Sequence, residues 1–351
     1  MMTRMDENMP FLLKYENVAW YENGEVRILD RRAYPAEIRF VKCTDYREVA
    51  QAITDMVTQS AGPYTAVGMG MALAAYQIRG KSEAEQETFL KQASFDLANS
   101  RPTAANRYSQ ITKRCAAVGI DALKNGKDPV EAIKNVSIES LNRRYSTMQI
   151  VGDSLADLIP EGGTILTQCF GETIIGTVIR AAIHQGKSFK AICAETRPYL
   201  QGARLTSSCF SGMGIETTVI TDNMAAYVMQ QGKVDLFTSA ADTITRDGHI
   251  ANKIGTLQLA ILSKYFGIPY YTTGIPDKDK NTVNDITIEM RDPQQVLSWR
   301  GVQNTLPGVN AIYPAFDIVP PYLISGIITD KGIFVPHLIN SYFNTEVKQF
   351  Y

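Results

Sequence analysis

Cysteine and histidine are scarce in this sequence of 351 residues, with five of the first and three of the second. No two cysteines form a C-x-x-C pair and the histidines have no metal-ligand spacing, so neither residue type predicts a zinc site. Scattered cysteines in odd number also argue against a disulfide framework and favour the reducing cytoplasm. These residues are Cys43, Cys115, Cys169, Cys193, Cys209, His184, His249 and His337.

An excess of one charge and long apolar runs are also missing. Lys and Arg total 35 against 36 Asp and Glu, a formal net charge of −1, which leaves no basic footprint for nucleic acid. No apolar run approaches the roughly 20 residues of a membrane-spanning helix. The polar first ten residues lack the apolar core of a signal peptide. We therefore expect a soluble cytoplasmic protein whose partner is a small molecule, with no nucleic-acid or membrane partner.

The sequence pattern changes near residue 148. Before it, apolar runs over 18–21 and 26–29 flank a turn and predict a β-hairpin. Helices are then expected from Asp45, Ser82, Arg101 and Asp128, where capping residues or prolines mark helix starts, and over the apolar segment 67–78.

After residue 148, short apolar runs alternate with helical stretches. Strands are expected over 164–167, 191–193, 218–221, 236–241 and 269–272. Such alternation predicts a parallel sheet with helices on both faces. We predict an α/β protein with a mostly helical N-terminal domain that carries a small β-hairpin (1–148) and a Rossmann-like parallel-sheet domain (149–351). No G-x-G-x-x-G follows the first strand, so a dinucleotide cofactor is not expected.

Two residues that can move protons follow predicted strands. Cys169 stands at a turn into a helix, and a helix N-terminus lowers the pKa of a thiol. The alternative interpretation is that Cys169 is a small buried hydrophobic residue without a catalytic role. Asp242 follows the strand 236–241, at the edge where open α/β sheets bind ligands. The alternative interpretation is that Asp242 caps a helix. Together they are candidates to flank a substrate.

Groups that bind anions or hydroxyls surround these positions in the predicted sheet. Asn252 and Lys253 precede a helix expected from Ile254, and the lysine and the free helix N–H groups favour an anion there. The segment 195–204 is rich in hydrogen-bonding side chains, as a site for a polyhydroxylated ligand requires. Arg101 is a candidate to bind phosphate through two parallel hydrogen bonds, or else forms a surface salt bridge.

Asp222 follows the predicted strand 218–221. It either extends the polar rim of this edge or caps a helix from Met224.

Three motifs resemble the methylthioribose-1-phosphate isomerase family: ETRPYLQGARLT (195–206), ITDNMA (220–225) and ANKIGT (251–256). That family shares its fold with regulatory subunits of the exchange factor for eukaryotic initiation factor two and with ribose-1,5-bisphosphate isomerases. Shorter matches at 29–35, 101–104, 314–317 and 327–332 extend the similarity over nearly the whole chain.

The resemblance implies an aldose–ketose isomerase of methionine salvage, usually a homodimer, with no metal or nucleotide cofactor. Its catalytic pair matches Cys169 and Asp242, and its substrate-binding positions match Gly62, Arg101, Gln201, Asn252 and Lys253. The expected reaction converts a 5-substituted ribose 1-phosphate, with a 5-methylthio or a 5-deoxy group, to the ribulose 1-phosphate. The alternatives are a non-catalytic sugar-phosphate-binding regulatory protein and a ribose-1,5-bisphosphate isomerase.

The chain departs from the family pattern in three places. The family's Arg-Gly-Ala-Pro-Ala-Ile-Gly is SAGPYTAVG over 60–68, which is longer and lacks the arginine. Its Thr-His-Cys-Asn is Thr167-Gln-Cys-Phe170, and its Gly-Ala-Asp-Arg is Ala240-Ala-Asp-Thr243. The catalytic pair is kept, whereas the C5 substituent and the group that binds the phosphate stay open. Proton transfer and a direct hydride shift between C2 and C1 also both stay open.

Overall fold

The structure, a computed structural model, describes residues 4–101, 105–299 and 301–344 and contains two compact units. The first unit extends to Thr147 and the second begins at Met148. This division falls inside a 30-residue helix, α6 (Pro129–Leu158). The helix therefore continues ten residues past residue 148, near which the sequence pattern was expected to change.

The first unit contains a three-stranded antiparallel sheet in the order β1-β2-β3. The predicted hairpin is confirmed as β1 (Ala19–Glu22) and β2 (Glu25–Leu29). Asn23 and Gly24 join them with φ of 50° and 83°, the backbone that a two-residue hairpin turn requires. The third strand, β3 (Phe40–Cys43), was not predicted.

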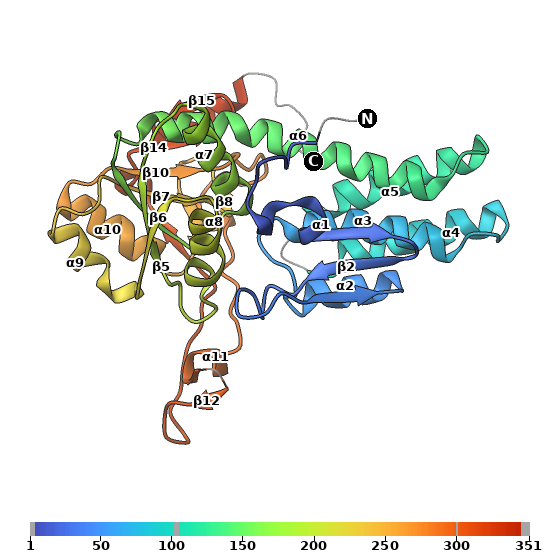
Figure 1. Cartoon of the computed structure of the whole chain (residues 1–351), viewed down its shortest axis with the longest axis horizontal. Helices are drawn as coiled ribbons and strands as arrows, with labels where there is room; N and C mark the ends of the chain where they lie inside the picture. Colours follow the sequence, from blue (N-terminus) through green and yellow to red (C-terminus); the bar gives the residue numbers. More distant parts are fainter. Residues whose placement is uncertain (1–3, 102–104, 300, 345–351) are drawn as a thin grey trace. The chain divides into compact units, whose positions relative to one another are not determined.

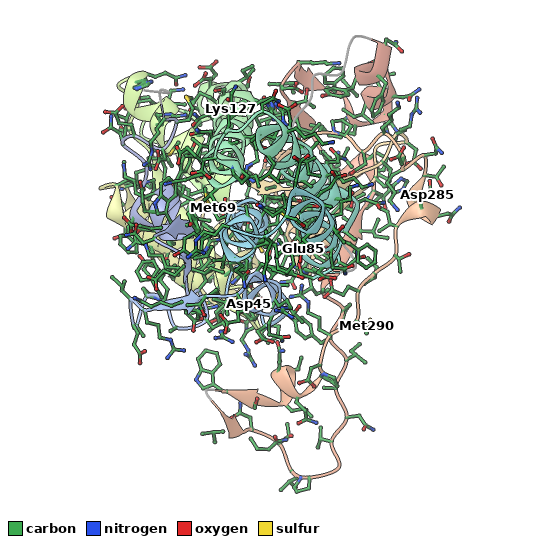
Figure 2. The ribbon with its side chains drawn as sticks, turned by 90° about the vertical axis from the view of Figure 1, so that its right-hand side faces the viewer. Asp45, Met69, Glu85, Lys127, Asp285 and Met290 are labelled. Atoms are coloured by element: carbon green, nitrogen blue, oxygen red, sulfur yellow. The ribbon has the colours of Figure 1, made fainter. Side chains whose placement is uncertain are left out.

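Outside this sheet, the described residues of the first unit are mostly helical, as the sequence predicted. They are η1 (Phe11–Leu13), α1 (Tyr15–Val18), α2 (Tyr46–Thr54), α3 (Gly62–Gln77), α4 (Glu83–Ala98), α5 (Ala105–Lys124) and the start of α6. Asp45 and Ser82 begin α2 and α4 with reciprocal capping boxes. Figure 2 looks along these helices and labels Met69, which is fully buried on α3. The expected helix start at 102–104 lies outside the described residues.

A seven-stranded sheet forms the centre of the second unit, in the order β15-β14-β10-β7-β4-β5-β6 (Figure 1). Neighbouring strands are parallel except β14 and β15. The five predicted strands all occur, within two residues of the predicted bounds. The strands are β4 (Thr164–Gln168), β5 (Lys190–Ala194), β6 (Glu216–Ile220), β7 (Leu236–Ala240), β10 (Tyr270–Thr273), β14 (Gly326–Thr329) and β15 (Gly332–Phe334).

Helices cover both faces of this sheet (Figure 1). One face carries α9 (Ala225–Gln230) and α10 (Thr256–Phe266), and the other carries α7 (Glu172–His184) and α8 (Ser207–Gly212). Because β4, β5 and β7 are parallel neighbours, their carboxyl ends meet at one edge, where ligands bind in open α/β sheets.

Antiparallel additions to the second unit were not predicted. A small sheet in the order β13-β9-β8 follows β7. A separate arm carries α11, β11 and β12; Figure 1 shows it extending from the sheet, and Figure 2 shows Met290 on its stalk. Remaining elements are β8 (Thr243–Ile244), β9 (Ile250–Lys253), α11 (Gln294–Leu297), β11 (Ser298–Trp299), β12 (Val302–Gln303), β13 (Phe316–Val319), a π-helical turn η3 (Gly202–Thr206), and the 3-10 turns η4 (Asp222–Met224), η5 (Val283–Asp285), η6 (Pro321–Leu323) and η7 (Pro336–Asn344).

Among the described helices, none combines the length and apolar character needed to cross a membrane.

Candidate active site

Cys169 occupies the turn between β4 and α7, with a backbone φ of 59°. Few residues other than glycine adopt this left-handed conformation. The N–H of Cys169 donates to Thr196 Oγ1 at 2.8 Å, and its carbonyl accepts a hydrogen bond from the Thr206 hydroxyl. The segment 196–206 thus holds the turn in place and fixes the position of a half-buried thiol.

Burial raises the pKa of the Cys169 thiol to about 11. The nearby Asp242 carboxylate raises the pKa further, while the cations of Lys253 and Arg291 lower it. The sequence-based expectation of a lowered pKa is therefore wrong, because desolvation of the thiolate outweighs the favourable charges. At neutral pH Cys169 is a thiol, which suits it to donate a proton rather than to attack as a nucleophile.

Asp242 lies two residues beyond β7, the direct neighbour of β4 in the sheet. Its N–H donates to the carbonyl of Ala251 at 2.9 Å, which starts the β8–β9 hairpin, so Asp242 precedes a strand and caps no helix. Its carboxylate is exposed and close enough to Cys169 to shift the pKa of the thiol. The structure thus brings the predicted pair together at the ends of adjacent strands.

Asn252 and Lys253 lie in β9 and not at a helix start. Both side chains are buried, at 3% and 5% exposure. Asn252 Nδ2 has no hydrogen-bond partner within the described part of the chain. Lys253 Nζ lies 4.2 Å from the ring centroid of Phe316 on the neighbouring strand β13.

The predicted anion site at the start of the following helix is occupied by the protein itself. Helix α10 begins at Thr256, and the N–H groups of Gly255 and Leu257 donate to the Asp317 carboxylate at 2.8 and 3.1 Å. Burial raises the pKa of Asp317 to about 6. These N–H groups are therefore already bonded within the protein, and the anion site predicted at this helix start is wrong.

The loop after β5 is held by a carboxylate from the next strand. Asp222 accepts hydrogen bonds from the N–H groups of Thr196 and Arg197 at 2.8 and 2.7 Å. It therefore does not cap a helix from Met224 with its side chain, one of the two roles expected for it. Thr196 and Leu200 both have positive φ, 65° and 62°, so this loop is tightly bent.

Gln201 follows this loop and is 3% exposed. Its Oε1 atom has no hydrogen-bond partner among the residues that the structure describes. At Gly202 a Cβ atom would lie 1.8 Å from the Ala194 carbonyl oxygen, so only glycine allows this approach to β5. Gln201 and Asn252 thus each present a buried, unpaired polar atom on a segment that contacts Cys169 or Asp242. A ligand that brings hydroxyl groups could complete the hydrogen bonding of both atoms.

Arg291 and Gln168 also belong to this region, although neither was predicted to be a site residue. Arg291 is largely buried, its Nε lies 2.9 Å from Glu289 Oε1, and its charge lowers the pKa of Cys169. Gln168 Nε2 donates to the carbonyl of Lys253 at 3.0 Å and so joins the end of β4 to β9. Arg291 lies in a segment without periodicity, whereas Gln168 belongs to the turn that departs from the family pattern.

Gly62 and Arg101 belong to the first unit. Gly62 is the first residue of α3. Arg101 lies near Tyr108, where its guanidinium opposes the rise that burial causes in the pKa of the phenol. The assignment of both residues to substrate binding stays a prediction.

In the described ranges, no group of three or more His, Cys, Asp or Glu side chains is arranged to hold a metal ion.

A family model described as the initiation factor 2 subunit family matches residues 61–336. The chain belongs to this family. A methylthioribose-1-phosphate isomerase from Chloroflexus aurantiacus is 39% identical over 337 residues, covering 90% of this chain and 94% of the relative. The resemblance that the sequence motifs carried is thereby confirmed.

Two solved structures match this chain with the same TM-score. The 5-methylthioribose 1-phosphate isomerase from Pyrococcus horikoshii OT3 is 32% identical with a TM-score of 0.79, covering 94% of this chain and 97% of its own. The delta subunit of translation initiation factor eIF-2B from A. fulgidus is 30% identical with a TM-score of 0.79, covering 91% and 96%. The overall fold therefore does not distinguish an enzyme from a translation factor subunit. That distinction has to come from the residues of the site.

Proposed function

We propose that the protein is an aldose–ketose isomerase that converts a 5-substituted ribose 1-phosphate to the corresponding ribulose 1-phosphate. The observation that carries the proposal is the pairing of the Cys169 thiol with the Asp242 carboxylate at the ends of two adjacent strands. Gln201 and Asn252 support it, because their buried unpaired atoms suit the hydroxyls of a sugar. The names of the relatives point to the same reaction class.

Cys169 and Asp242 can each carry out a different proton transfer in such a reaction. A sugar phosphorylated on its anomeric oxygen opens only when its ring oxygen gains a proton, and one hydrogen must then pass from C2 to C1. Cys169, protonated at neutral pH, donates to the ring oxygen, and Asp242 exchanges a proton with the C2 hydroxyl. No electrons are lost or gained overall, so the reaction needs no external oxidant.

The hydrogen can move by two routes. In proton transfer, a base removes it from C2 and returns a proton to C1. In a hydride shift, it passes directly between the carbons while Cys169 and Asp242 act only on the oxygens. Phe170 beside Cys169 is 4% exposed and keeps the turn dry, which suits either route.

The proposal extends to the sugar and to the assembly. The 5-methylthio and 5-deoxy sugars are the proposed substrates, and ribose 1,5-bisphosphate is the third candidate. We assign the reaction to residues 149–351, as a Rossmann-like catalytic domain, with 1–148 as the N-terminal domain. Five free cysteines favour the cytoplasm, and the family resemblance favours a homodimer.

The competing function is a sugar-phosphate-binding regulator without catalysis. The match to an eIF-2B subunit favours it. A binding protein, however, has no need of a protonated thiol and a carboxylate at adjacent strand ends, so the site favours the isomerase.

Phosphorus NMR of the purified protein tests the reaction and the sugar together. The substrates are 5-methylthioribose 1-phosphate, 5-deoxyribose 1-phosphate and ribose 1,5-bisphosphate. We expect a ketose 1-phosphate from a 5-methylthio or 5-deoxy sugar. With substrate deuterated at C2, label kept at C1 indicates the hydride shift, and label lost to water indicates proton transfer.

Saturable binding of these sugars without any product would assign the protein to the regulatory function. Turnover of the bisphosphate alone would keep the reaction class and overturn the proposed sugars.

A further inference from the structure

The arm that carries α11, β11 and β12 contacts the loop after β5 through Arg197. Arg197 Nη2 donates to the carbonyls of Val296 and Ser298, 99 and 101 residues further along the chain, at 3.4 and 3.3 Å. The guanidinium carbon also lies 5.0 Å from the ring centroid of Trp299, within the range of a cation–π contact. Arg197 therefore binds both α11 and β11 of an arm that extends from the sheet (Figure 1).

Arg197 is also next in the chain to the residue that holds the Cys169 turn. Thr196 Oγ1 accepts a hydrogen bond from the N–H of Cys169 at 2.8 Å. Asp222 accepts hydrogen bonds from the N–H groups of both Thr196 and Arg197, at 2.8 and 2.7 Å. A movement of Arg197 is therefore passed through one peptide bond to the side chain that binds the Cys169 backbone.

The backbone of this loop needs support from other parts of the unit. Thr196 and Leu200 have φ of 65° and 62°, in the left-handed region that residues other than glycine rarely adopt. Such a conformation persists when the surrounding structure holds it. Asp222 supplies part of that support, and the Arg197 side chain adds to it, since Nη1 donates to the Pro198 carbonyl at 3.1 Å. Because the same guanidinium binds the arm, the arm contributes to the support of the loop.

The base of the arm is closed by backbone hydrogen bonds. The N–H of Arg291 donates to the carbonyl of Tyr313, and the N–H of Ala315 donates to the carbonyl of Glu289, both at 2.8 Å. The base thus lies immediately before β13, which pairs with β9. The far part of the arm is exposed, with Leu306 at 79%. The contacts of Arg197 therefore lie between a closed base and an exposed tip, where they set how α11 and β11 lie against the loop.

We propose that Arg197 is a positioning residue for Cys169, which it holds in place by binding the arm to the loop 195–204. Its Nη1 and Nη2 atoms donate to three carbonyls of the chain, so these donors serve the protein's own backbone. The effect on catalysis rests on the proposed isomerase function, whereas the coupling between the arm and the thiol rests on the contacts of Arg197.

Kinetics of Arg197 variants test the effect on catalysis. Arg197→Met keeps an apolar side chain beside Trp299 and removes the donors. We expect its kcat to fall on the order of ten- to a hundredfold, because misplacing a catalytic group by about 1 Å has an effect of that size. The Kd of the sugar phosphate, measured by calorimetry, should change less than kcat. Arg197→Lys keeps the charge over the ring and should restore part of the rate.

Alkylation of Cys169 by iodoacetamide tests the coupling without any turnover. Loosening the turn admits water and reagent to the half-buried thiol, so the rate at pH 8 should rise several-fold in Arg197→Met. Trp299→Ala changes only the arm and should raise the rate as well, by a smaller factor. The double variant should react as Arg197→Met alone does, because both changes act through one contact. Mass spectrometry of the Cys169 peptide gives each rate.

Two variants serve as matched controls. Arg79 also stacks on an aromatic ring, 3.4 Å from the ring centroid of Tyr76, and donates to the carbonyl of the same residue, but it belongs to the first unit. Leu306 lies on the same arm and is exposed. Arg79→Met and Leu306→Ser should alkylate and turn over as the unchanged protein does.

The positioning role and the isomerase can fail separately. An unchanged alkylation rate in Arg197→Met would overturn the positioning role, and a raised Kd in that variant would then make Arg197 a ligand-binding residue. Faster alkylation in Arg197→Met but not in Trp299→Ala would overturn the part of the arm. Faster alkylation in both variants, with no ketose from any sugar, would support the coupling and overturn the isomerase.

Discussion

At the scale of single residues, Cys169 shows how burial and charge compete. Its place before α7 indicated a reactive thiolate, yet the pKa of the thiol is raised to about 11. Lys253 and Arg291 lower the pKa, but the water lost from around the sulfur has the larger effect. A pattern of strand, cysteine and helix identifies where the thiol lies, whereas its protonation depends on packing that the sequence does not reveal.

Alkylation of Cys169 by iodoacetamide should follow this raised pKa. Only the thiolate reacts, so at pH 7 we expect a rate on the order of a hundredfold below that of an unperturbed thiol. The rate should rise about tenfold per pH unit from pH 7 to pH 10. Mass spectrometry of the Cys169 peptide gives the rate, and the same peptide in unfolded protein is the control. A rate that levels off near pH 8 would contradict the raised pKa.

At the scale of elements, the first N–H groups of helix α10 are capped by a carboxylate on a strand distant in sequence. Asp317 on β13 accepts from Gly255 and Leu257 at 2.8 and 3.1 Å. From the sequence, we expected the helix to start near Ile254 and its free N–H groups to bind an anionic ligand. The error arises because Asp317 is more than 60 residues away in the chain, and no local pattern pairs β13 with β9.

Asp317 should make the stability of the protein depend on pH. Its pKa is raised to about 6, above the ordinary value near 4, so the folded state holds this proton more tightly. The resulting stability is fully present below about pH 4 and is lost as the pH rises through 6. In Asp317→Asn, the free energy of unfolding should fall less between pH 4.5 and 6.5 than in the unchanged protein, as urea denaturation measures.

Asp235→Asn is the control for this variant, since Asp235 likewise accepts a backbone N–H, from Thr164 at 2.7 Å. An unchanged pH dependence in Asp317→Asn would contradict the assignment of the raised pKa to Asp317.

Five of the seven strands of the large sheet were predictable because each is a short apolar run between turn residues, whereas β14 and β15 were not predicted. The same reasoning failed for β8, β9 and β13, which are short and lack alternation. It failed also for the arm beyond Met290, whose exposed Leu306 and Ile312 have no period to mark a helix or strand. Arg291, at the base of that arm, was missed for the same reason.

At the scale of the whole molecule, the sequence motifs identified the family. Family motifs identified Gln201, Asn252 and Lys253, and the structure explains them as buried groups at one edge of the sheet. The missing arginine of the segment 60–68 was visible in the sequence.

The account depends most on Cys169 and Asp242 acting as a catalytic pair. The most direct test measures kcat and sugar-phosphate binding for Cys169→Ser and Asp242→Asn with whichever sugar turns over. Cys193→Ala, in the neighbouring strand β5, and Asp279→Asn, in an exposed turn, are matched controls. We predict that each site variant loses about 10²–10⁴-fold in kcat while still binding the sugar phosphate, and that the controls do not. Turnover within a few fold of the unchanged protein in either site variant would contradict the account.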